Sequence, residues 1–430
     1  MISVHDTMHT YLLKCTMKPY CMEKICNLGK GETLFVKGPA RITLRTGRIR
    51  IGGSDRSRFI VKEGRSCTLE GIQDSEVKVV LGSGAAIEKF KSFYYPRIWQ
   101  KFSHEILQKK GVIMIMGAPD TGKTTFATFL ANEALQKGIS VAVIDSDIGQ
   151  SDIGPPSTIG LAFLTHEITR MSEVAADEFY FIGTTSVQNV CDMVLGLKEL
   201  VDSALEKVDV VIIDTCGYVL GDTGRRLKTS KLQAITPDVV VALQKGNELY
   251  PIVRGWHGEV VEVKAPKEAR RVPRHIRREI RESRWGKTFE EAQERQIDLE
   301  EKKLLNTYLL SGKRIDTHIF AKLLQCEVLY AEEIPEGFFI VKKEKLHEYQ
   351  HQPVSFSGST LKALDSGWEE NLVVGLLNHG QFIDLGIVKK INYHNMMAAI
   401  SCREHEFDSI KFGRIKVDES GREQGFIDWC

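Results

Sequence analysis

The residues with the clearest chemical potential lie in the segment GVIMIMGAPDTGKTT, residues 111–125. Gly117 and Gly122 enclose four residues and are followed by Lys123 and Thr124, which is the spacing of a phosphate-binding loop. Backbone N–H groups of such a loop face a polyphosphate, the lysine reaches its β- and γ-phosphates, and the threonine hydroxyl ligates Mg²⁺. The segment therefore predicts a site for ATP or another nucleoside triphosphate with Mg²⁺. The residues expected to form it are Gly117, Asp120, Thr121, Gly122, Lys123, Thr124 and Thr125.

Carboxylates follow two apolar segments that have the composition of buried strands. Asp145 and Asp147 follow residues 141–144, and Asp214 follows residues 210–213. Carboxylates at the carboxyl edge of a parallel sheet, beside a phosphate loop, are placed to act on Mg²⁺, water or a hydroxyl nucleophile. Asp214 has the position of a Walker B carboxylate, which holds the metal, commonly through water. Each aspartate could instead cap the turn after it, and we expect only one of Asp145 and Asp147 to face the nucleotide.

Residues 264–287 form a basic stretch with ten lysines and arginines against three glutamates. Its arginines recur every three or four residues, so a helix would place several of them along one side. A solvated helix face is one interpretation of such a charge run. The acids are too few to neutralise the arginines, which favours a role toward polyphosphate or nucleic acid.

The bulk composition fits an intracellular protein of two or three domains. The chain has 430 residues, 42% of them hydrophobic, and a formal net charge of +1, so any nucleic-acid affinity must come from a local patch. Nine cysteines occur without a C-x-x-C pair, and we interpret them as reduced thiols. No leader sequence and no apolar run of spanning length is evident. We expect a soluble cytoplasmic protein, or a nuclear one in a eukaryote, without a membrane partner.

The order of patterns predicts an α/β protein with a central P-loop NTPase domain built on a parallel sheet. Residues 1–100 show short alternating segments between glycines, which is typical of a small antiparallel β-sandwich. Residues 101–305 alternate apolar strands with helices and end in the basic stretch, which we treat as a lid. Residues 290–310 are expected to be helical because their charges are mixed. Residues 306–430 are predicted to form a β-rich C-terminal domain.

The combination of motifs resembles the polynucleotide 5′-hydroxyl kinases. This family includes archaeal RNA kinases, the kinase subunit of the eukaryotic pre-mRNA cleavage complex and nucleolar kinases of ribosomal RNA processing. The resemblance covers nearly the whole chain. It rests on five segments: the loop 117–125, the run DSDIGQ at 145–150, GTT at 183–185, DTCGY at 214–218 and the pair Arg277 and Arg281.

The resemblance implies transfer of the γ-phosphoryl group of ATP, or another NTP, to the 5′-hydroxyl of an RNA end. Whether a DNA end is also an acceptor stays open. It implies catalytic roles for Lys123 and for Asp147, the general base that deprotonates the hydroxyl. The roles implied for the remaining residues are a clasp on the acceptor phosphate (Thr184, Thr185 and Ser186), stacking on its base (Tyr218), orientation of water or the nucleophile (Gln150) and a lid over the transferring phosphates (Arg277 and Arg281).

Two departures and two structural alternatives accompany these assignments. Ser186 stands where relatives often have proline, and Tyr218 where they often have tryptophan. Both residues retain the relevant chemistry, so we expect altered affinity rather than a lost function. Tyr218 could instead be a packing aromatic, and Thr184 and Thr185 could cap the helix expected near residue 188.

Three functional hypotheses follow. The first is an active 5′-hydroxyl kinase in RNA processing or repair. The second is a catalytically silent ATP-binding scaffold of an RNA-processing complex with unidentified protein partners. The third is a GTPase or ATPase of the metallochaperone or targeting type, but the sequence has neither a guanine-reading N-K-x-D motif nor a metal-delivery cysteine pair.

Overall fold

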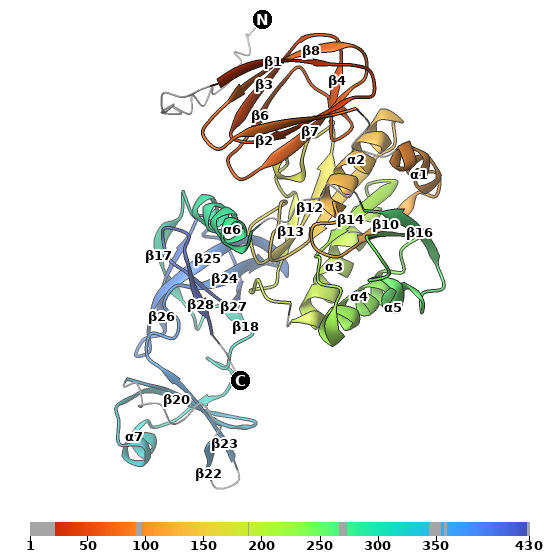
Figure 1. Cartoon of the computed structure of the whole chain (residues 1–430). Helices are drawn as coiled ribbons and strands as arrows, with labels where there is room; N and C mark the ends of the chain where they lie inside the picture. Colours follow the sequence, from red (N-terminus) through yellow and green to blue (C-terminus); the bar gives the residue numbers. More distant parts are fainter. Residues whose placement is uncertain are drawn as a thin grey trace, which may run out of the picture. The chain divides into compact units, whose positions relative to one another are not determined.

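The computed structural model describes residues 22–91, 97–187, 189–265, 273–343, 354–356 and 359–427 (Figure 1). The chain forms two compact units, Met1–Ile98 and Trp99–Cys430. No helix in these described ranges is long and apolar enough to cross a membrane.

The first unit is a sandwich of two antiparallel sheets, ordered β1-β8-β3-β6 and β5-β4-β7-β2-β9. Its strands are β1 (Met22–Leu28), β2 (Thr33–Lys37), β3 (Ala40–Thr46), β4 (Ile49–Ile51), β5 (Ser54–Asp55), β6 (Arg58–Val61), β7 (Ser66–Gly71), β8 (Ser75–Leu81) and β9 (Ala86–Phe90). In β8 the buried Val77, Val79 and Leu81 alternate with more exposed residues, because successive side chains of a strand point to opposite faces. The predicted antiparallel β-sandwich is confirmed.

The second unit contains the central seven-stranded sheet, ordered β13-β12-β11-β14-β10-β15-β16. Its strands are β10 (Gly111–Met116), β11 (Val141–Ser146), β12 (Thr158–Leu164), β13 (Glu178–Phe181), β14 (Val210–Thr215), β15 (Val239–Gln244) and β16 (Glu259–Lys264). The five strands β11, β14, β10, β15 and β16 are parallel. The predicted parallel sheet is therefore present, with two further strands, β12 and β13, that pair antiparallel at one edge. Residues 158–164 had not been predicted as a strand.

Helices cover both faces of this sheet, as its continuous apolar strands require (Figure 1). They are α1 (Arg97–Leu107), α2 (Lys123–Gln136), α3 (Val190–Leu205), α4 (Gly221–Ile235) and α5 (Tyr250–Val253), with a short 3₁₀ turn η1 (Met171–Glu173). Trp99 of α1 packs edge-on against Phe126 of α2, with ring centroids 4.9 Å apart. Helices α3, α4 and α5 share a buried core with the opposite face of the sheet.

The remainder of the second unit is mainly β structure, as expected for a β-rich C-terminal region. One seven-stranded sheet has the order β17-β26-β25-β24-β27-β18, with β28 paired to β27, and a second sheet has the order β19-β20-β21-β23-β22. Its elements are α6 (Arg274–Thr288), β17 (Gln293–Asp298), β18 (Lys303–Leu305), β19 (Lys313–Arg314), α7 (His318–Leu324), β20 (Val328–Ile334), β21 (Gly337–Lys342), β22 (Val354–Phe356), β23 (Ser359–Asp365), β24 (Leu372–Asn378), β25 (Gln381–Asn392), β26 (Met397–Cys402), β27 (Ser409–Val417) and β28 (Glu423–Phe426).

The helical prediction for residues 290–310 was wrong. The segment contains β17 and β18, and β17 pairs with β26 over its whole length. Ile297 and Leu299 are buried in the core of the C-terminal sheet. The mixed charges of this segment suggested a helix, but pairing with distant strands and burial against them outweigh the weak local preference.

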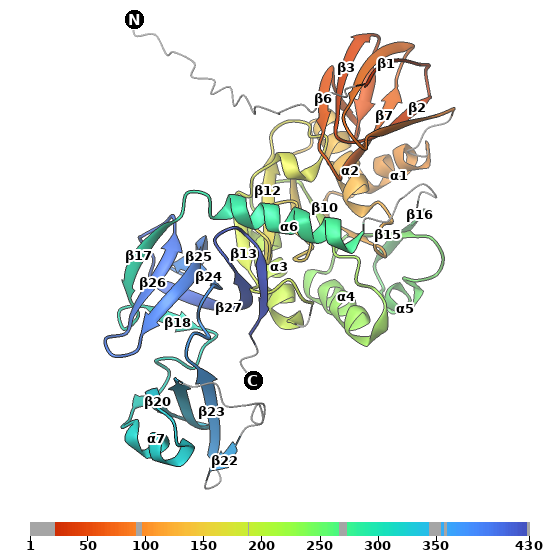
Figure 2. The same ribbon diagram turned by 60° about the vertical axis from the view of Figure 1, so that its left-hand side comes forward.

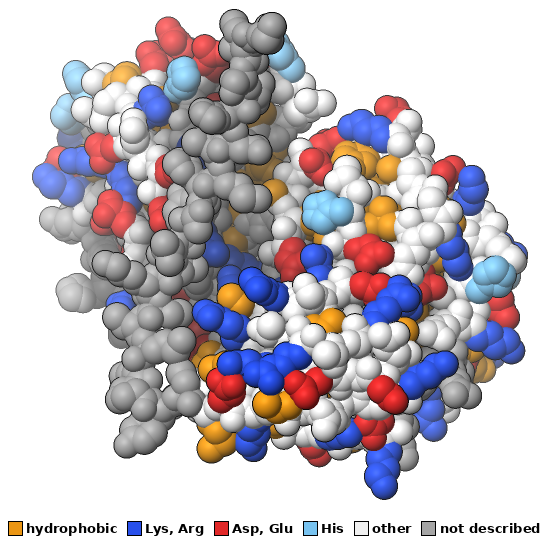
Figure 3. All heavy atoms as spheres, turned by 90° about the horizontal axis from the view of Figure 1, so that it is seen from above, with side chains coloured by type: hydrophobic (Ala, Val, Ile, Leu, Met, Phe, Trp, Pro, Cys, Tyr) orange, Lys and Arg blue, Asp and Glu red, His pale blue; other side chains and the backbone are white. Residues whose placement is uncertain are grey.

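Helix α6 carries most of the described part of the basic stretch and extends between the central sheet and the C-terminal sheet (Figure 2). Lys267, Arg270 and Arg271 of the predicted lid lie outside the described residues. On the molecular face drawn in Figure 3, basic side chains are interspersed with acidic ones, in keeping with the net charge of +1. Selective attraction of a polyanion must therefore come from local groups.

Candidate active site

The phosphate loop connects β10 to α2 and has the backbone that its glycines permit. Gly122 caps α2 with a φ of 93°, and Asp120 also has a positive φ of 57°. A Cβ atom at Gly117 would lie 2.4 Å from the Leu243 carbonyl oxygen, so only glycine fits there. Lys123 is buried, its Nζ donates to the Ala118 carbonyl oxygen at 2.9 Å, and burial lowers its pKa. These features give the loop the form expected for a phosphate cradle.

Asp214 and Thr124 meet beside this loop. The Thr124 hydroxyl donates to Asp214 Oδ2 at 2.5 Å, from the first turn of α2 to the end of β14. Asp214 Oδ1 is also buried and has no hydrogen-bond partner among the described residues. Burial raises the pKa of Asp214 to about 6, and nearby Lys123 acts in the opposite direction. A buried oxygen without a partner, next to a hydroxyl, fits the needs of a hard cation such as Mg²⁺.

The two aspartates after β11 have different environments. Asp145 is buried, and its carboxylate accepts the backbone N–H groups of Asp147, Asp152 and Ile153. Burial and the neighbouring Asp214 raise its pKa well above the ordinary value. Asp145 therefore organises the turn of residues 147–152, which we name the catalytic turn.

Asp147 lies at the start of the catalytic turn and is only partly buried. Its Oδ1 accepts the N–H groups of Gly149 and Gln150, each at 3.2 Å. The backbone thereby orients the carboxylate through this oxygen. Asp145 is buried and Asp147 only partly buried, and the expectation that only one of them faces the nucleotide stays a prediction.

Helix α6 lies against the phosphate loop and the catalytic turn. Arg277 Nη2 donates to both carboxylate oxygens of Asp120 at 2.8 and 2.9 Å. Arg284 pairs with Asp152 and donates to the Gln150 carbonyl oxygen at 3.3 Å. The Gln150 side chain turns back to the carbonyl oxygens of Gly149 and Arg277, at 2.6 and 3.3 Å. Arg277 is therefore the arginine of the predicted pair that contacts the phosphate loop.

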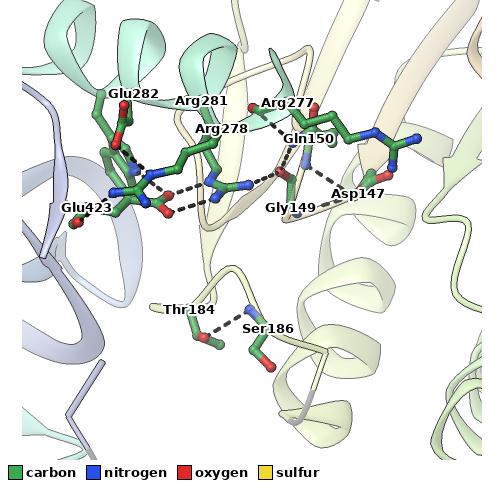
Figure 4. Close-up of polar contacts among 11 residues, drawn as sticks. Asp147, Gly149, Gln150, Thr184, Ser186, Arg277, Arg278, Arg281, Glu282 and Glu423 are labelled. Atoms are coloured by element: carbon green, nitrogen blue, oxygen red, sulfur yellow. Dashed lines mark hydrogen bonds and ion pairs between the residues drawn. The ribbon is translucent and has the colours of Figure 1, made fainter. Parts of the chain in front are cut away.

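Arg281 is engaged elsewhere (Figure 4). Its guanidinium binds both carboxylate oxygens of Glu423 in β28. Its Nη1 donates to the Gly149 carbonyl oxygen at 3.2 Å. The arginine thus ties the C-terminal sheet to the catalytic turn, while its predicted role over the transferring phosphates stays a prediction.

The clasp residues follow β13 and lie close to the catalytic turn. A Cβ atom at Gly149 would be 3.5 Å from the Thr185 carbonyl oxygen. Thr184 is buried, and its Oγ1 accepts the Ser186 N–H at 3.1 Å, so it shapes the turn on which Thr185 and Ser186 are half-buried. Asn189 caps α3, because its side chain accepts the N–H of Asp192. The alternative that Thr184 and Thr185 cap this helix was therefore wrong.

Tyr218 follows β14 and is 41% exposed, which disfavours the alternative of a packing aromatic. The preceding Gly217 lies against the phosphate loop, because a Cβ atom there would be 2.7 Å from the Pro119 nitrogen. The structure thus places an exposed aromatic ring on a segment that touches the nucleotide loop. Its stacking on a base stays a prediction.

Two buried lysines of α4 were not anticipated. Lys228 Nζ donates to the Cys216 carbonyl oxygen at 2.6 Å, and Lys231 Nζ donates to the Ser146 hydroxyl at 3.0 Å. Both side chains are fully buried, and burial lowers the pKa of Lys231 to about 8. They bind the backbone and side chain at the ends of β14 and β11, next to Asp214 and Asp145. The available signal was their helical spacing on the apolar face that also carries Leu227 and Leu232.

The fold and site define a P-loop phosphotransferase in which a phosphate cradle, a backbone-oriented carboxylate and an arginine-bearing helix adjoin one another. Residues 117–291 match the family model described as mRNA cleavage and polyadenylation factor CLP1 P-loop. A polyribonucleotide 5′-hydroxyl-kinase of Pyrococcus abyssi is 36% identical over 332 residues, which cover 75% of this chain and 92% of that protein. A polyribonucleotide 5′-hydroxyl-kinase of Methanocaldococcus jannaschii is 35% identical over 333 residues, which cover 75% of this chain and 91% of that protein.

The chain belongs to the polyribonucleotide 5′-hydroxyl-kinase family. A solved structure of Clp1p in complex with Pcf11p has the same fold, with a TM-score of 0.64 and 10% identity, over 93% of this chain and 99% of that one. The predicted family and fold class are confirmed.

Proposed function

We propose that this protein is an ATP-dependent polyribonucleotide 5′-hydroxyl kinase that acts in RNA processing or repair. The observation that carries the proposal is that Arg277 of α6 contacts both the phosphate loop, at Asp120, and the catalytic turn, at Gln150. The oriented carboxylate of Asp147 lies on the same turn. Membership in the family of archaeal kinases with that name supports it.

The phosphate loop would bind the nucleotide. Backbone N–H groups after Gly117 would bind the β- and γ-phosphates, and Lys123 would leave the Ala118 carbonyl to reach them. Arg277 would leave Asp120 and bind the γ-phosphoryl oxygens. There it would stabilise the negative charge that these oxygens carry in the transition state. The remaining residues proposed for nucleotide binding are Asp120, Thr121, Gly122, Thr124 and Thr125.

Asp147 would act on the RNA acceptor as the general base. Its carboxylate would accept the proton of the RNA 5′-hydroxyl as the hydroxyl oxygen bonds to the γ-phosphorus and the bond from that phosphorus to the β–γ bridging oxygen breaks, releasing ADP. The contacts from Gly149 and Gln150 hold the carboxylate in place before the substrate arrives. Gln150 is proposed to orient the nucleophile from the same turn.

A divalent cation fits the pair Thr124 and Asp214, because the buried Asp214 Oδ1 has no partner in the described part of the chain. We propose Mg²⁺, held by these two residues. When bound, it would neutralise charge on the phosphate oxygens. Thr124 and Asp214 already lie in contact, so the chain supplies these two oxygen ligands with little rearrangement.

The acceptor strand would lie along the clasp and Tyr218. Thr185 and Ser186 would donate hydrogen bonds to its terminal phosphate, on the turn shaped by Thr184. Tyr218 would stack on its base, which tolerates any sequence because every base has a π face. RNA is the proposed acceptor and DNA a further one. The domain boundaries near residues 100 and 305, a cytoplasmic location and association with RNA-processing proteins stay predictions.

The test is transfer of label from γ-labelled ATP with Mg²⁺ to a 5′-hydroxyl RNA oligonucleotide, with a 5′-phosphorylated oligonucleotide as control. We expect labelled RNA with the wild-type protein and loss of label with Asp147→Asn and Lys123→Ala. A DNA oligonucleotide of the same sequence reports the preference for RNA. ATP binding without transfer to either polymer would contradict the proposal and favour a nucleotide-binding scaffold.

A further inference from the structure

The hairpin formed by β27 and β28 has a tip that its own side chains make rigid. Asp418 Oδ1 accepts the N–H groups of Ser420 and Arg422 at 2.9 and 3.0 Å, and Oδ2 accepts from Gln424 Nε2 at 2.7 Å. The backbone adds bonds between Asp418 and both Arg422 and Gly421. The hairpin can therefore act as a fixed support rather than a loose end.

This tip lies against the backbone of α6. A Cβ atom at Gly421 would be 2.5 Å from the Glu282 carbonyl oxygen and 2.5 Å from the Gly286 nitrogen, and Gly421 has a φ of 83°. The backbone of the hairpin and that of α6 approach so closely that a side chain at Gly421 would displace one of the two segments. The C-terminal sheet therefore fixes the position of the arginine helix along this contact.

Glu423 extends from the hairpin to the arginine helix. Both of its carboxylate oxygens bind the Arg281 guanidinium, one at 2.7 Å, and Trp285 Nε1 lies 3.4 Å from Oε1. The side chains of Glu423 and Arg281 are only 12% and 19% exposed, so water and salt screen the pair weakly. Trp285 is fully buried in a cluster with Phe181 and Ile415. A bidentate pair in this setting gives the guanidinium one orientation.

That orientation points the third nitrogen of Arg281 at the catalytic turn (Figure 4). Nη1 donates to the Gly149 carbonyl oxygen, while the Gly149 N–H donates to Asp147 Oδ1. A continuous chain of contacts thus runs from Glu423 through Arg281 and Gly149 to the proposed general base. Glu423 itself lies in β28 and takes part through Arg281.

We infer that Glu423 is a positioning residue for the phosphoryl transfer, acting through Arg281 to hold the catalytic turn and its Asp147 carboxylate. The inference rests on the proposed function. Without the carboxylate of Glu423, the guanidinium can rotate away from Gly149 and the turn loses one of its ties. A displacement of about 1 Å at a reacting group can cost about 100-fold in rate. The phosphate loop does not depend on this tie, so ATP binding should be spared.

The test compares Glu423→Gln with Glu419→Gln, a matched change in the same hairpin at a side chain that is 84% exposed. We expect kcat for RNA phosphorylation to fall about 10- to 100-fold in Glu423→Gln, with KM for ATP within about twofold of wild type. Glu419→Gln should leave both constants unchanged. Glu423→Asp keeps the charge on a shorter side chain and should give an intermediate kcat, which provides a second readout if Glu423→Gln folds poorly.

A double-mutant cycle separates positioning from general support of the fold. Because Glu423 acts through Arg281, Glu423→Gln should change kcat by less than about twofold in an Arg281→Ala background. An equal loss in both backgrounds, or wild-type kcat in both Glu423 variants, would overturn the inference while leaving the proposed function intact. A wild-type protein that labels no RNA in the same assay would remove the proposed function and this inference with it.

Discussion

The nucleotide side and the acceptor side of the site are held together in different ways. The phosphate loop is one continuous segment, and its internal contacts, such as Lys123 to Ala118 and Thr121 to Ala118, span at most five residues. The acceptor side joins segments far apart in sequence. Arg281 binds Glu423 across 142 residues and Gly149 across 132 residues.

This difference predicts different sensitivities. A loop whose shape comes from its own glycines and backbone should keep that shape when distant residues are substituted. Remote groups such as Arg277 and Asp214 contact it, but its backbone conformation does not depend on them. A site tied by side-chain ion pairs between separate elements depends on each partner, because removing one leaves a buried charge without compensation. Nucleotide affinity and acceptor chemistry should therefore be separable by mutation, and the following experiments test that separation.

The largest effect is expected for Arg277→Ala. Removing an arginine that stabilises the transferring phosphoryl group costs about 10³- to 10⁵-fold in kcat in related chemistry. We expect a loss in that range in the RNA labelling assay, with ATP affinity changed much less. The control is Arg278→Ala, a neighbour whose side chain is 59% exposed and pairs with Glu282. Equal losses in the two variants would show that the helix contributes only general positive charge.

A pH-dependent stability effect is expected at Asp214, whose pKa burial raises from 3.8 to about 6. A raised folded-state pKa favours the protonated form, so this stabilising contribution is complete below pH 3.8 and is lost as the pH rises through 6. Two pKa units correspond to roughly 3 kcal/mol. Without nucleotide and Mg²⁺, the thermal midpoint of Asp214→Asn should rise relative to wild type between pH 4 and 6 and then level off.

The exposed Asp222→Asn serves as the control for that experiment, since its side chain is 85% exposed. Its midpoint should follow the wild-type curve across the whole pH range. A constant offset between Asp214→Asn and wild type would contradict the assigned burial effect.

Tyr218→Ala should weaken the acceptor side alone. Loss of base stacking costs about 1 to 3 kcal/mol, which corresponds to a rise in KM for RNA of roughly 5- to 150-fold. KM for ATP should stay within about twofold. Tyr218→Phe keeps the aromatic face and should behave as wild type. A rise in KM for ATP with an unchanged KM for RNA would assign the ring to the nucleotide side instead.

The smallest effect is expected for Thr184→Val, which preserves shape and removes the hydroxyl that accepts the Ser186 N–H. A hydrogen bond of this kind contributes about 0.5 to 1.5 kcal/mol. KM for RNA should rise roughly 2- to 10-fold with KM for ATP unchanged. Thr184→Ser restores the hydroxyl and should restore KM for RNA. Failure of that rescue would mean that the methyl packing of Thr184, rather than its hydroxyl, shapes the clasp.

The sequence alone was enough to predict the phosphate loop, because the features that define it lie within one short segment. Glycine conformation and the spacing of Lys123 and Thr124 can be read within one segment, and Asp214 is marked by the apolar strand before it. The antiparallel sandwich was also predictable, because apolar and polar residues alternate in strands such as β8 and show which face is buried. The family followed from the combination of these segments.

Only the tertiary structure decided what remote segments do to one another. It gave Asp145 and Asp147 different hydrogen-bond partners and paired Arg277 with Asp120 and Arg281 with Glu423. It also made residues 293–298 a strand rather than a helix. Strand pairing and ion pairs join residues more than a hundred positions apart, and local propensity contains no information about such partners. The lysines of α4 show the same limit, because their burial depends on strand ends that the helix sequence does not encode.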